Sequence, residues 1–252
     1  MLKIDHLTKR FGGLAAVNDV SASCERGTIN AIIGPNGAGK TTFFNLISGA
    51  IAPTSGKVLF DGKDVTGLRA DQVARLGMAR TFQTTTLFDT ATVLDNLIVG
   101  HRLRTGSTLV DAVLGTRRMK EEERRCREKA RAALDFVGLS HIESRIAGDI
   151  SQEERKRVAF ALALSTDPTL LLLDEPAGGV NPEETEGLAR LIRKMADSGL
   201  TVCLIEHKMD MIMNLADRIL VLNYGERIAE GTPAEIRTNP VVIEAYLGSE
   251  HA

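Results

Sequence analysis

The chain has 252 residues, of which 43% are hydrophobic and 25% charged, and its formal net charge is −2. This length favours one large domain, or one domain with a subdomain, and the balanced charge gives no global field that would attract nucleic acid. The three cysteines are scattered and form no C-x-x-C, which excludes a recognisable zinc or disulfide framework and indicates reduced thiols. With no run of 18 apolar residues and no signal-peptide pattern, we expect a chain that does not cross a membrane by itself.

The N-terminal part predicts an antiparallel β layer. Residues 2 to 30 alternate apolar and polar positions around Gly12, Gly13 and Gly27. Residues 57 to 65 contain Asp61-Gly62, a dipeptide typical of a tight hairpin.

A phosphate-binding pattern follows this layer. Residues 28 to 33 predict a buried strand and residues 41 to 47 the start of a helix. The segment between them fits G-x-x-x-x-G-K-[ST] at every specified position and reads Gly34-Pro35-Asn36-Gly37-Ala38-Gly39-Lys40-Thr41. In such a loop, backbone N–H groups converge on phosphate oxygens beside the positive end of a helix. We expect Lys40 to reach the β- and γ-phosphates and Thr41 to reach Mg²⁺; a structural glycine turn is the alternative.

Between residues 88 and 150 the pattern is helical. The segment Thr116 to Arg131 mixes both charges, which predicts a solvated helix face with ion pairs. Binding of an acidic partner by its arginines is the alternative, and the residues concerned are Arg117, Arg118, Arg124 and Arg125.

After residue 150, helices and strands alternate as in parallel α/β units. Four leucines, 170 to 173, predict a buried strand that ends in Asp174 and Glu175. The strand at 201 to 205 is followed by Glu206 and His207, after a helix at about 183 to 198. Ligands bind at the carboxyl ends of such strands, so we expect Asp174 to hold Mg²⁺ and Glu175 to polarise an attacking water. His207 would contact the γ-phosphate or the water, although a lone histidine is more often structural.

Together these residues resemble the ATP-binding cassette (ABC) ATPases, which power membrane transporters. The resemblance implies an α/β fold: a P-loop NTPase core, mostly a parallel sheet with flanking helices, plus an N-terminal antiparallel β layer and an inserted α-helical subdomain. We expect one ABC ATPase domain over 1–252, with the core and β layer at about 1–87 and 166–252 and the helical subdomain at about 88–165.

The resemblance also implies roles for single residues. Gly34 to Thr41, with Thr42, resembles the Walker A loop, and Leu170 to Glu175 resembles the Walker B strand with its catalytic glutamate. Gln83, in Arg80-Thr81-Phe82-Gln83, is similar to the Q-loop glutamine that touches Mg²⁺ and the attacking water. His207 is similar to the switch histidine.

Further residues resemble contacts to the base and to a partner subunit. Asn181, in Ala177 to Pro182, is similar to the D-loop residue that reaches across a dimer. Phe11 occupies the position of the aromatic that stacks on adenine, with Val17 packing nearby. Core packing is the alternative for Phe11.

Finer features resemble the ATPases of branched-chain amino acid importers and their relatives, among them Arg80 to Gln83, Glu175 to Pro182 and the ending from Ile228 to Gly248. The resemblance implies an ATPase that uses ATP and Mg²⁺ to energise a separate membrane permease. Its partners would be a second ABC ATPase subunit and the permease, with a solute-binding protein involved only indirectly and no nucleic acid. The location would be cytoplasmic, on the inner face of the cell membrane.

One motif departs from the family. Where members carry a signature close to L-S-G-G-Q, this chain has Ile150-Ser151-Gln152-Glu153-Glu154. The serine remains, but Glu153 puts a carboxylate where the signature approaches the γ-phosphate bound to the opposite subunit. Ser151 and Glu154 also form a capping box, and the two roles are compatible.

The departure in the signature and the phosphate loop by itself leave alternative functions open. They are a regulatory or scaffold subunit with weak hydrolysis, a soluble ABC ATPase, and another P-loop enzyme such as a kinase or GTPase. In a heterodimer, we expect one competent and one impaired ATP site.

Overall fold

The structure is a computed structural model that describes residues 1–81, 87–102 and 117–247. It divides into two compact units: residues 1–83 with 169–252, and residues 84–168.

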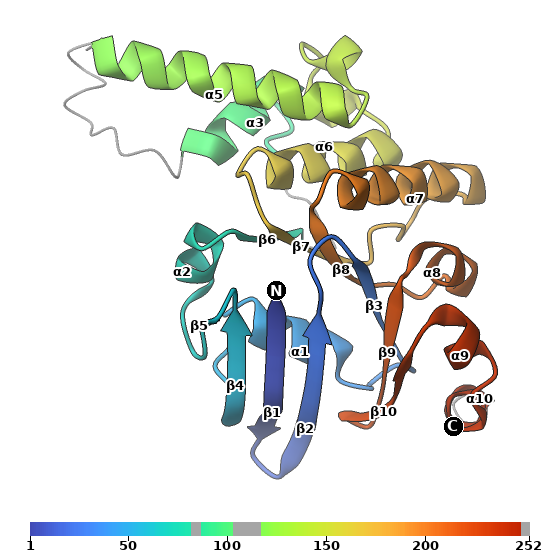
Figure 1. Ribbon diagram of the computed structural model, residues 1–252. Helices are drawn as coiled ribbons and strands as arrows, with labels where there is room; N and C mark the ends of the chain where they lie inside the picture. Colours follow the sequence, from blue (N-terminus) through green and yellow to red (C-terminus); the bar gives the residue numbers. More distant parts are fainter. Residues whose placement is uncertain (82–86, 103–116, 248–252) are drawn as a thin grey trace. The chain divides into compact units, whose positions relative to one another are not determined.

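The first unit contains an antiparallel sheet of four strands in the order β2-β1-β4-β5 (Figure 1). The strands are β1 (Leu2–Phe11), β2 (Leu14–Cys24), β4 (Ser55–Phe60) and β5 (Lys63–Asp64). Asp61 and Gly62 turn the chain between β4 and β5, with φ angles of 49° and 76° that suit this dipeptide. The expected antiparallel layer is confirmed.

The second sheet has six strands in the order β10-β9-β3-β8-β7-β6. These are β3 (Ile29–Ile33), β6 (Met78–Thr81), β7 (Leu170–Asp174), β8 (Thr201–Ile205), β9 (Arg218–Asn223) and β10 (Glu226–Gly231). Neighbouring strands are parallel from β9 to β6, whereas β10 pairs antiparallel with β9. Strands β3, β7 and β8 therefore end at the same edge.

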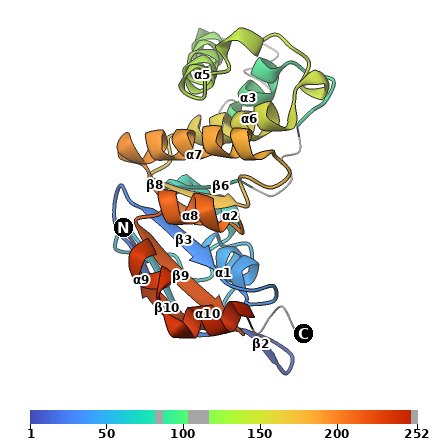
Figure 2. The same ribbon diagram turned by 90° about the vertical axis from the view of Figure 1, so that its right-hand side faces the viewer.

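Helices cover this sheet. They are α1 (Lys40–Ile47), α2 (Ala70–Arg75), α7 (Pro182–Asp197), α8 (Met209–Leu215), α9 (Pro233–Arg237) and α10 (Pro240–Leu247). Helix α1 lies between the two sheets, where Phe43 and Phe44 join one buried cluster with Leu170 and Leu172 of β7 (Figure 1). Because strand side chains alternate, Leu171 and Leu173 face the other side of the sheet, and both are fully buried. Figure 2 shows α8, α9 and α10 together beside β9 and β10.

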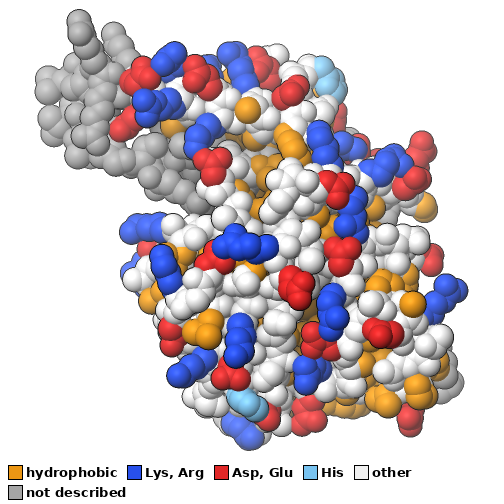
Figure 3. All heavy atoms as spheres, in the orientation of Figure 1, with side chains coloured by type: hydrophobic (Ala, Val, Ile, Leu, Met, Phe, Trp, Pro, Cys, Tyr) orange, Lys and Arg blue, Asp and Glu red, His pale blue; other side chains and the backbone are white. Residues whose placement is uncertain are grey.

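The second unit is helical, with α3 (Val93–Arg102), α5 (Arg117–Phe136), α6 (Gln152–Leu164) and two short turns, η1 (Ser140–Ile142) and η2 (Ala147–Asp149). On α5, exposed Arg124 pairs with Glu121 at 2.7 Å, as a solvated, ion-paired helix face requires. Figure 3 shows Lys and Arg side chains interspersed with Asp and Glu over one face of the molecule.

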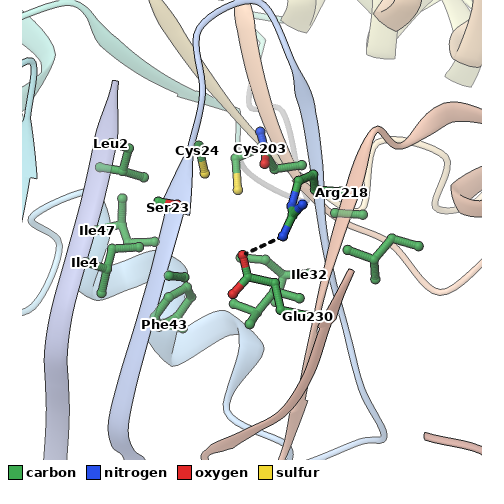
Figure 4. Close-up of a pocket in the computed structure, with 15 residues that line it drawn as sticks. Leu2, Ile4, Ser23, Cys24, Ile32, Phe43, Ile47, Cys203, Arg218 and Glu230 are labelled. Carbon is green, nitrogen blue, oxygen red and sulfur yellow. Dashed lines mark ion pairs between the residues drawn. The ribbon is translucent and has the colours of Figure 1, made fainter. Parts of the chain in front are cut away.

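A small cavity of about 20 Å³ lies between the two sheets (Figure 4). Cys24 and Cys203 line it, and an ion pair of 3.6 Å joins Arg218 and Glu230 beside it. One water needs about 10–15 Å³ by this measure, so the cavity is too small for a nucleotide. Cys24, Cys126 and Cys203 are all buried thiols that form no disulfide among the described residues. Among the described residues, no helix is both long and apolar enough to span a membrane.

Candidate functional site

The phosphate loop connects β3 to α1 and is built around two glycines that packing requires. A Cβ on Gly34 would lie 2.0 Å from the carbonyl oxygen of Leu222, and a Cβ on Gly39 would lie 2.3 Å from that of Ala16. Both glycines have positive φ angles, 149° and 94°. Since no side chain fits at these positions, the backbone of the loop itself forms its surface.

Lys40, the first residue of α1, folds back over this loop. Its Nζ donates hydrogen bonds to the carbonyl oxygens of Gly34, at 2.6 Å, and Pro35, at 2.8 Å. Burial lowers the pKa of Lys40, and the nearby Glu175 carboxylate opposes this by raising the pKa. The loop thus holds a cation in its centre, where it can meet phosphate oxygens. Thr41 is exposed and Thr42 half-buried just behind it.

Asp174 ends β7 in a buried position next to Arg80 of β6. Its Oδ2 accepts a hydrogen bond from Arg80 Nη2 at 2.9 Å. Its Oδ1 is buried, and among the described residues it has no hydrogen-bond partner. A carboxylate oxygen of this kind fits a divalent cation, which prefers such ligands.

Glu175 and His207 form a pair at the same sheet edge. His207 follows β8, and its Nε2 lies 2.8 Å from Glu175 Oε1. Glu175 has a φ of 49°, rare for a residue with a side chain, and its N–H donates to the carbonyl of Ile205. Backbone strain of this size, about 1 kcal/mol or more, persists where the surroundings hold it. The pair is partly exposed, so it is accessible to solvent and substrate.

Sequence reasoning missed two charged neighbours of His207. Glu206 is only 2% exposed, and its carboxylate accepts from the backbone N–H groups of Ala177, at 3.0 Å, and His207, at 3.1 Å. Lys208 Nζ donates to the Val180 carbonyl at 2.9 Å. Both residues tie the segment 177–180 to the end of β8. Their only sequence signal is that they flank His207.

Phe11 and Val17 lie in different environments. Phe11 is 51% exposed at the end of β1, and Lys9 Nζ lies 5.1 Å from the centre of its ring. Core packing, the alternative for Phe11, is therefore wrong. Val17, which the resemblance places near the ATP-binding aromatic residue, has no exposed surface and belongs to the buried cluster between the sheets.

Asn181 and Ser151 each begin a helix through a capping box. Asn181 Oδ1 accepts from the N–H of Glu184 at 2.9 Å, and Ser151 Oγ accepts from the N–H of Glu154 at 3.1 Å. A hydroxyl that accepts a hydrogen bond still carries a proton to donate. The cap therefore leaves Ser151 able to bind an anion.

Two arginines face the carboxylates that follow Ser151. Glu153 pairs with Arg157 at 2.6 Å, and Glu154 with Arg145 at 3.4 Å. These partners reduce the charge repulsion that the sequence predicts for the signature. Gln83, the remaining candidate residue, lies outside the described residues.

Comparison with known proteins identifies the family. A family model described as "ABC transporter" matches residues 17–178. The chain belongs to the ABC transporter family. A second model, "Branched-chain amino acid ATP-binding cassette transporter", matches residues 226–252 of this ABC protein.

Relatives of this ABC protein match along nearly its whole length. It is 41% identical to the high-affinity branched-chain amino acid transport ATP-binding protein BraF of Pseudomonas aeruginosa over 98% of both chains. It is 40% identical to LivG of Escherichia coli K12, with the same coverage. Among solved structures, an ATP-binding cassette of an ABC transporter in its ADP conformation matches with a TM-score of 0.87, at 34% identity over 98% of both chains. These findings confirm the expected fold, ATP binding and ATPase class, and they disfavour a kinase or GTPase.

Proposed function

We propose that this ABC ATPase is the ATP-hydrolysing subunit of an importer for branched-chain amino acids or related small solutes. The observation that carries the proposal is the common sheet edge at which the phosphate loop, Asp174, Glu175 and His207 lie. The transport roles in the names of its relatives and the family match at residues 226–252 support the cargo class.

We assign the binding roles as follows. The backbone of Gly34 to Gly39 and the ammonium of Lys40 bind the ATP phosphates, and the exposed ring of Phe11 stacks on adenine. Thr41, Gln83 and the open oxygen of Asp174 would hold Mg²⁺. When bound, this ion neutralises charge on the phosphates.

Glu175 and His207 carry the hydrolytic step in this proposal. Glu175 aligns a water molecule and accepts its proton as the water oxygen attacks the γ-phosphorus. The bond between this phosphorus and the bridging oxygen to the β-phosphate breaks, and ADP and phosphate leave. His207 holds Glu175 through the contact of 2.8 Å and lies where it can stabilise charge on the γ-phosphate.

Each site is completed by a second cassette. Ser151 and Asn181, both exposed at the start of a helix, would contact the ATP bound to the partner subunit. The paired carboxylates at Glu153 and Glu154 are compatible with a weakened contact. In a heterodimer, this chain's own loop would serve the competent site and its signature the impaired one.

The assembly would act at the membrane. Closure of two cassettes on ATP moves a separate permease, so the chain works in the cytoplasm at the inner face of the membrane. A solute-binding protein takes part only through the permease, and nucleic acid is not a partner. The segment of about 88–165 serves as the helical subdomain of the single cassette.

The decisive experiment measures phosphate release by the chain purified with its permease. Glu175→Gln is expected to lower turnover about 100-fold or more while ATP still binds, because the substitution removes the proton acceptor and keeps the shape. Making the same change in a partner paralogue tests the asymmetry, and equal losses would contradict it. A reconstituted complex without multiple turnovers would favour the regulatory or scaffold subunit instead. Leucine uptake into proteoliposomes tests the cargo.

A further inference from the structure

We propose that Arg80 is a positioning residue that holds Asp174 by one oxygen and keeps the other oxygen open for Mg²⁺. The inference rests on the proposed function, since it concerns how this site prepares for the ion.

The first observation is a buried ion pair. Arg80 Nη2 lies 2.9 Å from Asp174 Oδ2, and the two side chains are only 8% and 5% exposed. A buried carboxylate without a partner is strongly unfavourable, so Arg80 is what allows Asp174 to sit here as a charge. The pair also fixes the direction of the carboxylate, because Oδ2 is committed to the guanidinium.

The second observation is the other side of the same guanidinium. Arg80 Nη1 donates to Asn45 Oδ1 at 2.7 Å and to Ser48 Oγ at 2.8 Å, and both residues belong to the turn at the end of α1. The guanidinium carbon lies 5.8 Å from the centre of the Phe44 ring. Helix α1 begins at Lys40, so Arg80 connects the helix of the phosphate loop directly to the end of β7. A lysine cannot make this set of contacts, because it lacks the planar fork of donors.

The third observation is the oxygen that remains. Asp174 Oδ1 is buried and, within the described part of the chain, accepts no hydrogen bond. Arg80 thus divides the carboxylate into one occupied and one available oxygen. Two effects oppose each other here, because the positive charge of Arg80 repels a cation while its hydrogen bond orients the ligand. Loss of an orienting partner typically lowers metal affinity about 10–100-fold, so we expect orientation to dominate.

The test compares ATP binding with and without the ion. ATP affinity of the purified full chain is measured by calorimetry in Mg²⁺ and again in EDTA. The wild-type protein is expected to gain affinity from Mg²⁺. In Arg80→Met, the factor by which Mg²⁺ raises ATP affinity should fall about tenfold or more. Its ATP affinity in EDTA should change less than about twofold. Arg80→Lys should recover part of the lost factor.

Controls separate positioning from folding and from the function itself. Arg75→Met makes the same substitution at an exposed arginine of α2 and should keep the full gain. If Arg80→Met is too unstable to purify, the double variant Arg80→Met with Asp174→Asn removes the unpaired charge. Compared with Asp174→Asn alone, the double variant should show no further loss of the ATP affinity gained from Mg²⁺. An undiminished or larger gain in Arg80→Met, or an additional loss in the double variant, would overturn the inference. A wild-type chain without any gain would instead contradict the proposed function.

Discussion

At the scale of single residues, the hydrogen bonds of the Lys40 ammonium to the described residues all lie within the phosphate loop. The ammonium donates these hydrogen bonds to the loop carbonyls of Gly34 and Pro35. Lys40→Ala is therefore expected to abolish measurable ATP binding and to leave the thermal midpoint nearly unchanged, because the ammonium serves phosphate charge. Calorimetry with ATP checks this. Lys63→Ala, at an exposed position of β5, is the matched control and should bind ATP normally.

The residues that sequence reasoning missed share one physical property. Arg80, Glu206 and Lys208 are charged, and charged side chains are ordinarily predicted at the surface. Each is instead buried or half-buried, because a specific partner elsewhere in the chain compensates its charge or hydrogen-bonding groups. Such partners depend on which strands become neighbours. Local patterns along one sequence do not reveal which strands will be neighbours.

At the scale of elements, the strands that could be predicted from the sequence are those with a strong local pattern of apolar residues. Strands β7 and β8 were predictable because each is an apolar run buried along its whole length. Strand β6 was not, since Met78 to Thr81 is short and contains Arg80. Strand β10 is half-exposed and charged, so its composition does not predict a strand. Its conformation is set by its pairing with β9.

The capping boxes allow a prediction about Ser151. Ser151→Ala removes an N-cap acceptor and should cost about 1 kcal/mol of unfolding free energy. If Ser151 also contacts ATP of the partner subunit, ATPase activity of the assembled complex should fall about tenfold or more. Thr232→Ala is the matched control, because Thr232 and Glu235 form the same box at α9. It should lose similar stability and keep its activity; equal activity in both variants would leave Ser151 a cap only.

At the scale of the whole molecule, the C-terminal helix α10 lies beside the phosphate loop, and Tyr246 of this helix is near Gly34. Burial raises the pKa of Tyr246, and although the nearby backbone of Gly34 opposes this shift, the pKa reaches about 12. Folding therefore favours the protonated phenol. The raised pKa stabilises the folded state fully below the ordinary tyrosine pKa of about 10, and this stabilisation is lost as the pH rises towards 12.

Urea unfolding at pH 9 and pH 11.5 tests this linkage. The wild-type protein should lose more unfolding free energy between the two pH values than Tyr246→Phe, which cannot ionise at this position. Exposed Tyr224→Phe serves as the matched control and should behave like the wild type. Parallel losses in all three proteins would contradict a buried, protonated Tyr246.

The arginine partners of Glu153 and Glu154 have a consequence for ionic strength. These pairs are only partly shielded from solvent, and charges at a surface are screened over about 8 Å at physiological salt and over less at higher salt. Concentrated salt weakens these pairs and equally screens the repulsion between the two carboxylates and a phosphate, so the arginines matter most at low ionic strength. Closure of two cassettes across this helix should therefore depend on Arg145 and Arg157 more strongly at low salt than at high salt.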